Sequence, residues 1–61
     1  MDIPKHTRDR MIELVQIVGS IDWAATQVGL SPSFVRAYRS EHERFDARVK
    51  DAELSFKARL E

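Results

Sequence analysis

The sequence contains no cysteine, two histidines, two glycines and two prolines, and it has no apolar stretch of the length that a membrane helix needs. Without cysteine, neither disulfides nor a thiolate zinc site can form, and His6 and His42 are too few for a histidine-based site. A membrane span requires about 20 apolar residues, and the charged N-terminus is not followed by the apolar segment of a signal peptide. We therefore expect no bound metal and no membrane partner.

A chain of 61 residues, of which 43% are apolar and 33% charged, is long enough for one small domain spanning residues 1–61. It is too short for a barrel enzyme or a nucleotide-binding α/β sheet. No Ser/His/Asp set, paired carboxylates or Gly-rich phosphate loop can be assembled from its residues. We therefore expect no enzymatic activity and no cofactor. A domain this small without a disulfide or metal usually depends on a partner.

The ten basic and ten acidic residues cancel, whereas a DNA-binding domain is expected to show a basic face. The charge is nevertheless unevenly distributed. Residues 14–40 carry Arg36 and Arg39 against the single acid Asp22, whereas residues 41–61 carry five basic and six acidic side chains. This distribution predicts a weak, local positive surface and excludes a strong basic stripe.

Apolar residues recur with helical spacing along the whole chain, and no segment alternates with a period of two. A first helix is predicted from Lys5 or Thr7 to Val18 by the spacing of Met11, Leu14, Val15 and Val18. Gly19 is expected to end this helix in a left-handed conformation. Ser20 is expected to cap a short second helix that ends at Gly29, with Ala24, Ala25 and Val28 facing inward and Ile21 closing one end.

A third helix is predicted from the N-cap Ser31 and the following Pro32 to about Ser40. Val35 and Tyr38 share its apolar face. After a polar break at residues 41–43, a fourth helix is expected to run to Glu61. Its apolar seam consists of Phe45, Val49, Ala52 and Phe56.

Residues 20–40 have the features that a helix-turn-helix requires. Ala25 is small enough to let the two short helices approach closely, and Gly29 allows the positive φ of the turn. The hydrophobic residues that would lock the helices together are Val28, Leu30, Val35 and Tyr38. The alternative is a plain three- or four-helix bundle with a tight second turn. We predict an all-α fold with a homeodomain-like helix-turn-helix core and a longer C-terminal helix.

A longer pattern runs from Gly19 to Phe45: Gly19-Ser20, Ala24-Ala25, Gly29-Leu30-Ser31, Tyr38-Arg39, Glu41-His42-Glu43 and Phe45. It resembles the N-terminal helix-turn-helix DNA-binding domain of phage terminase small subunits. Two residues depart from the family pattern. Phe34 stands where a polar residue is commoner, and Pro32 replaces what is often a basic residue. Both departures weaken the electrostatic case for tight DNA binding.

The resemblance implies that the protein recognises viral DNA for genome packaging and presents it to the large terminase subunit in the cytoplasm of the infected bacterial host. It also implies a homo-oligomer of the full-length protein, of which a chain ending within a helix is the N-terminal domain. Homeodomain-like domains of transposases, recombinases and transcription regulators share the motif and remain an alternative. A helical protein-interaction module, which would use Phe34, Phe56 and Leu60, is an alternative of another class.

The outward positions of the third helix are the first candidates for DNA contact, because arginines there can pair with phosphates or with guanine. The residues that we predict to bind DNA on this helix are Ser31, Ser33, Arg36, Ala37, Arg39 and Ser40. A second basic cluster, which also includes His6, contributes Lys5, Arg8 and Arg10. These three residues would bind as an arm in the minor groove, or they form an ordinary solvated first helical turn.

The remaining distinctive side chains have simpler interpretations. Phe34 is expected to complete the core, Trp23 to pack at the core edge, and His42 to cap helix-end carbonyls. Phe56 and Leu60 extend beyond what so small a core can cover. They are therefore predicted to contact another subunit or partner, unless the fourth helix folds back on the core.

Overall fold

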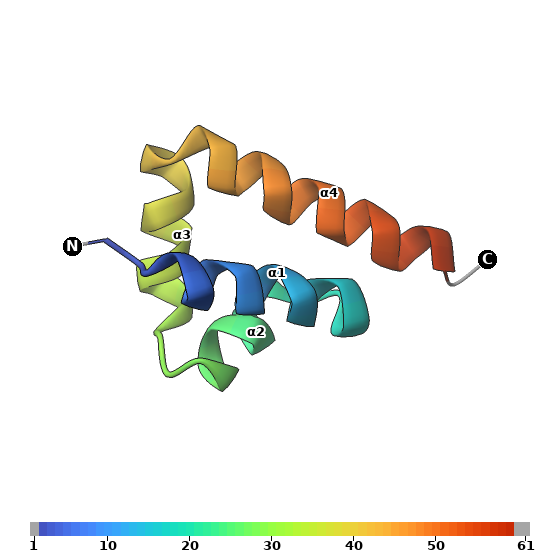
Figure 1. The fold of residues 1–61 in the computed structure, drawn as a ribbon, viewed down its shortest axis with the longest axis horizontal. Coiled ribbons are helices and arrows are strands. Elements are labelled where there is room, and N and C mark those ends of the chain that lie inside the picture. The colour runs from blue at the N-terminus through green and yellow to red at the C-terminus, as the bar shows by residue number, and fades with distance from the viewer. Residues whose placement is uncertain (1, 60–61) are drawn as a thin grey trace.

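The structure, a computed structural model, describes residues 2–59, and these residues contain four helices. They are α1 (Lys5–Val18), α2 (Ile21–Gln27), α3 (Pro32–Glu41) and α4 (Glu43–Arg59). Helix α1 lies between α4 and α2, runs in the same direction as α4, and has α3 lying across its beginning (Figure 1). No strand occurs in the described residues. The all-α prediction is confirmed.

Local capping explains where the helices begin and end. The Oγ of Ser20 accepts a hydrogen bond from the backbone N–H of Trp23, and the Oγ of Ser31 accepts one from Phe34, each at 3.1 Å. Gly19 follows α1 with φ 82°, a conformation that L-residues adopt only at a cost. These predicted caps are confirmed. The polar break is shorter than expected, because only His42 separates α3 from α4.

A tight turn at residues 28–31 joins α2 to α3. The N–H of Leu30 donates to the carbonyl of Ala25 at 2.9 Å, and the N–H of Gly29 donates to Thr26 at 3.1 Å. With Gly29 at φ 80°, this is the Schellman ending of a helix, which satisfies its last carbonyls. Ala25 is fully buried, as close approach of the two helices requires. Residues 20–40 therefore form two short helices joined by a tight turn, as both the helix-turn-helix and the plain-bundle alternatives require.

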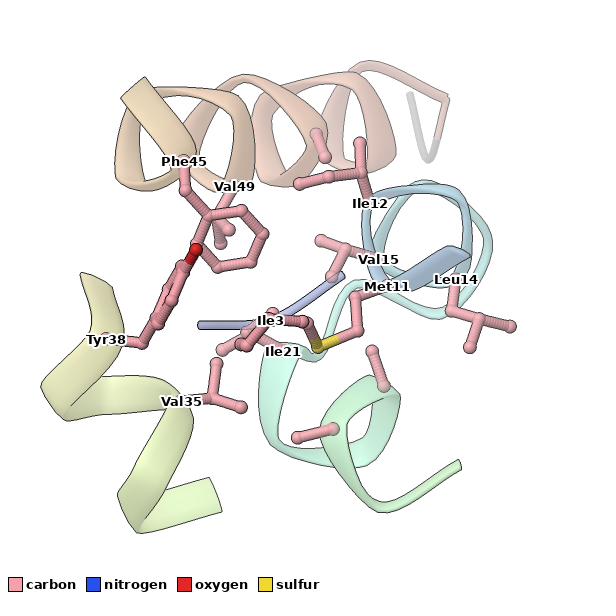
Figure 2. Packing of buried hydrophobic residues seen from close by; sticks show 13 residues of the cluster. Ile3, Met11, Ile12, Leu14, Val15, Ile21, Val35, Tyr38, Phe45 and Val49 are labelled. Atoms are coloured by element: carbon pink, nitrogen blue, oxygen red, sulfur yellow. The ribbon is translucent and has the colours of Figure 1, made fainter. Parts of the chain in front are cut away.

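One hydrophobic core joins all four helices. Tyr38 of α3 and Phe45 of α4 point toward each other, with ring centroids 5.4 Å apart and the rings nearly perpendicular (Figure 2). Such edge-to-face contacts contribute beyond the area they bury. The buried residues of this core are Ile3, Met11, Ile12, Leu14, Val15, Ile21, Ala24, Ala25, Val35, Tyr38, Phe45, Val49 and Ala52. Val28, Leu30 and Phe34 are partly buried and pack against it, so Phe34 completes the core as expected.

The core differs from the predicted one at a few positions. Ile3 and Ile12 are buried although no pattern marked them, because α1 is covered by both α2 and α4 and the N-terminal segment folds onto the core. Val18 was predicted to face the core but is 39% exposed, since it lies in the last turn of α1. Trp23 keeps 40% of its surface exposed, more than a residue at the core edge was expected to show.

The second half of α4 approaches the end of α1. A Cβ atom built on Gly19 would lie 2.4 Å from the ring of Phe56, so this half-buried ring lies against the glycine backbone. Leu54, on the neighbouring surface of α4, is 64% exposed. Leu60, the other residue predicted to contact a subunit or partner, lies outside the described residues. That role of Phe56 and Leu60 stays a prediction.

None of the helices in residues 2–59 combines the length and the apolar character that crossing a bilayer requires.

Candidate nucleic-acid interface

One face of α3 is turned away from the core. Because Val35 and Tyr38 point inward, the opposite side of the helix is left to solvent. Figure 1 shows α3 at one end of the molecule, with the other helices gathered on one side of it. The predicted DNA-binding residues that are exposed here are Ser31, Ser33, Arg36, Ala37 and Ser40. Five of the six predicted residues of this helix segment thus form a continuous accessible surface.

Arg36 makes an exposed ion pair with α2. Its Nη2 lies 3.0 Å from Oδ2 of Asp22, with side-chain exposures of 63% and 50%. Exposed pairs of this kind contribute at most about 1 kcal/mol, because water and salt screen both charges. The guanidinium of Arg36 can therefore leave Asp22 for another anion.

Arg39 was predicted to point outward, and this prediction is wrong. Its Nε lies 2.6 Å from Oδ1 of Asp46 on α4, and only 19% of its side chain is exposed. Lys50 approaches the other carboxylate oxygen of Asp46 at 3.2 Å. The hydrogen bond from Arg39, followed by that from Lys50, lowers the pKa of Asp46 below its ordinary value of 3.8. Arg39 is therefore drawn toward α4, and it ties α3 to that helix.

A shallow hollow of about 260 Å³ lies beside this ion pair. It is lined by Arg36, Arg39, Ser40 and Asp46, and so it brings together three of the residues predicted to bind DNA. Lys50 pairs with Asp46, one of the residues that line this hollow. Lys50 was not among the residues predicted from the sequence, although its i, i+4 spacing from Asp46 on a helix indicated an ion pair.

The second basic cluster belongs to α1 and is not an arm. The helix begins at Lys5, which lies 3.0 Å from Asp9, and Arg10 pairs with Glu13. Arg8 is half-buried, and its Nε is buried without a hydrogen-bond partner. The geometry is that of an ordinary helix start, in which Lys5 and Arg10 are exposed and Arg8 is half-buried. Any DNA contact by Lys5, Arg8 and Arg10 stays a prediction.

The segment before α1 is fastened to α3. A carboxylate oxygen of Asp2 accepts a hydrogen bond from the hydroxyl of Tyr38 at 2.5 Å and another from the N–H of Ile3 at 3.0 Å. The Tyr38 hydroxyl lowers the pKa of Asp2, and the same hydrogen bond raises the pKa of Tyr38. The Ile3 side chain is only 2% exposed. This segment therefore holds α3 in place.

His42 ends α3 in the way that was predicted. Its Nδ1 lies 2.9 Å from the carbonyl oxygen of Tyr38, which can only accept, so Nδ1 carries the proton and donates it. The imidazole also stacks on the Tyr38 ring at a centroid distance of 3.8 Å. The expectation that His42 caps a helix-end carbonyl is confirmed. Within residues 2–59, no three His, Asp or Glu side chains gather closely enough to hold a metal ion.

These contacts predict a loss of stability in acid. The pKa values of Asp2, Asp9 and Asp46 are all lowered by hydrogen bonds from Tyr38, Lys5 and Arg39, respectively. A carboxyl whose pKa is lower in the folded state stabilises the fold above its unfolded value of 3.8, and this contribution is lost as the pH falls below that value toward the folded pKa. We expect the melting temperature to fall as the pH is lowered below this value. Circular dichroism melts recorded from about pH 6 to about pH 2 would measure the decrease.

The matched variants are Asp46→Asn and Asp51→Asn. The first removes the Asp46 titration and should flatten the acid dependence, whereas Asp51→Asn should retain the wild-type dependence. Equal flattening in both variants would show that total charge, and not the contact with Arg39, causes the acid sensitivity.

No protein-family model, curated protein or solved structure gives a significant match to this chain.

Proposed function

We propose that this domain binds double-stranded DNA with the exposed face of α3 in the major groove. The observation that carries the proposal is the composition of that face: Ser33, Ala37 and Ser40 are small, and Arg36 alone is long and basic. Small side chains let a helix approach base edges closely, and an arginine can reach phosphate or the O6 and N7 atoms of guanine. The turn before α3 is the one that presents a recognition helix in helix-turn-helix proteins.

Binding by a single domain is expected to be weak. The net charge is zero, and four of the predicted DNA-binding cations, Lys5, Arg10, Arg36 and Arg39, are already paired with carboxylates. The few phosphates that the domain can neutralise give a shallow dependence of affinity on salt. Avidity in an oligomer would supply the remaining affinity.

The biological role that we propose is recognition of viral DNA by a terminase small subunit during genome packaging. Its support is the resemblance of residues 19–45 to that family. The partners would then be double-stranded DNA, further copies of the full-length protein and the large terminase subunit, in the cytoplasm of the infected host. A transposase, recombinase or regulator domain would bind DNA with the same residues.

The protein-interaction alternative has weaker support. Two of the three side chains that it would use are engaged within the domain, because Phe34 packs against the core and Phe56 lies against Gly19. Arg36, by contrast, is exposed and only loosely held.

The proposal is tested by titrating the isotopically labelled domain with a short duplex of mixed sequence, followed by NMR at low and then moderate salt. We expect salt-sensitive shifts concentrated on residues 31–40. An unperturbed spectrum at low salt would refute DNA binding by the single domain. Shifts confined to α4 would point instead to the interaction module.

Replacing Arg36 by glutamine provides the matching mutational prediction. Arg36→Gln should weaken binding of the duplex by about tenfold and reduce the salt slope by about one, because one phosphate contact is lost. The control is Arg59→Gln, which removes the same charge at the far end of α4 (Figure 1), where Arg59 donates to the carbonyl of Gln16. Equal effects of the two variants in fluorescence anisotropy would mean that the duplex responds only to net charge.

A further inference from the structure

Both arginines predicted to bind DNA from α3 are held by an aspartate of a neighbouring helix, but the two pairs differ in burial. The pair between Arg39 and Asp46 is largely covered, with exposures of 19% and 26%, and Lys50 supports it from α4. The pair between Arg36 and Asp22 is open, with exposures of 63% and 50%. The first pair is part of the packed contact between α3 and α4, whereas the second lies in solvent and can open without disturbing the core.

Asp22 is held close to the proposed interface. It lies in the first turn of α2, where a carboxylate is favoured by the helix dipole, and its backbone carbonyl accepts a hydrogen bond from the Thr26 hydroxyl at 3.0 Å. Its backbone is therefore held in the helix, and from there its side chain reaches Arg36. A DNA phosphate that binds Arg36 must displace the Asp22 carboxylate. The bound phosphate then lies beside that negative charge.

We infer that Asp22 competes with DNA phosphates for Arg36 and so lowers the affinity of the domain for any duplex. The inference rests on the proposed DNA binding and adds to it a residue that sets its strength. Arg39 takes no part in this exchange, because Asp46 holds it in a largely covered ion pair. Of the two arginines, only Arg36 is available to DNA, and Asp22 controls that availability.

The experiment compares Asp22→Asn with Asp51→Asn, since both replacements remove one negative charge and leave a side chain of the same shape. Asp51 lies on the exposed surface of α4. Binding of a fluorescein-labelled duplex of mixed sequence is followed by anisotropy from about 50 to about 200 mM salt. We expect Asp22→Asn to bind about five- to tenfold more tightly at the lower salt, with a salt slope steeper by about one. Asp51→Asn should change the affinity by less than about twofold, because Asp51 is a solvent-screened charge on α4, whereas the ion-pair partner of Arg36 is Asp22.

A second pair of variants separates competition from simple repulsion. In the Arg36→Gln background, Asp22→Asn should bind no more tightly than Asp51→Asn does, because no arginine remains to be released. If the full gain persists in that background, Asp22 acts by direct repulsion of DNA and the inference is wrong. Circular dichroism melting of each variant confirms that the compared proteins are folded.

The outcomes also separate this inference from the proposed function. If the wild type binds the duplex and Asp22→Asn binds no better than Asp51→Asn, the competition by Asp22 is refuted and DNA binding stands. If neither the wild type nor Asp22→Asn binds at the lowest salt, DNA binding by the domain is refuted, and the role of Asp22 with it.

Discussion

Replacing Phe45 by alanine is expected to lower the free energy of unfolding by about 3–5 kcal/mol, the range seen when a buried phenylalanine is removed from a core. Phe45 is 3% exposed, and its ring meets that of Tyr38 edge-on. It lies in the first turn of α4 and joins this helix to α3. A domain of 61 residues has a total stability of roughly 3–9 kcal/mol. We therefore expect the variant to lose about a third or more of its stability and to melt far below the wild type, as measured by circular dichroism and urea titration.

Phe56→Ala is the matched control, because it makes the same change on the same helix. The Phe56 side chain is only half-buried, so its loss should cost about 1 kcal/mol. A Phe45→Ala variant that melts within a few degrees of Phe56→Ala would show that α4 does not pack on the core through its first turn.

The second large effect is expected at Gly19, where alanine should cost about 2–3 kcal/mol. Its φ of 82° alone costs an L-residue roughly 1–2 kcal/mol. In addition, the new Cβ would lie 2.4 Å from the Phe56 ring, so the ring must move and lose its packing. The contact between the end of α1 and the second half of α4 would open. Thermal unfolding and the NMR signals of the Phe56 ring would report the change.

Gly29→Ala measures the cost of the positive φ alone, without a collision with a neighbouring side chain. Gly29 has nearly the same φ, 80°, but no atom lies within 4 Å of the position that a Cβ would take. We expect a loss of about 1 kcal/mol. Equal losses at the two glycines would mean that the Phe56 ring moves away at no cost and contributes little to stability.

The helix boundaries could be predicted from the sequence because their causes are local. Ser20 and Ser31 cap the helices that directly follow them, and Gly19 and Gly29 end those that precede them. The burial of Ile3 could not be predicted. No periodicity marks a lone isoleucine ahead of a proline, and its burial depends on how the N-terminal segment folds over helices far along the chain.

The candidate site likewise contains some side chains whose direction could be predicted from the sequence and one, Arg39, whose direction could not. Ser33, Arg36 and Ala37 face outward as the helical repeat predicted, because the inward face is set by Val35 and Tyr38 on the same helix. The position of Arg39 depends on Asp46, which belongs to another helix. Helical periodicity places Arg39 near the boundary between the two faces. The Asp46 carboxylate, which determines the direction of the Arg39 side chain, comes near it only when α3 packs against α4.

The hydrogen bond from Tyr38 to Asp2 and the ion pair from Arg39 to Asp46 hold α3 from two sides. These two contacts fix the direction of the α3 axis when the chain folds. The helix therefore has little freedom to reorient when the domain binds a partner. A helix that cannot reorient to fit the groove of a duplex requires the DNA to change its shape instead. If the domain binds DNA as we propose, duplexes with easily deformed base steps would be preferred over stiff ones, even where no base edge is touched.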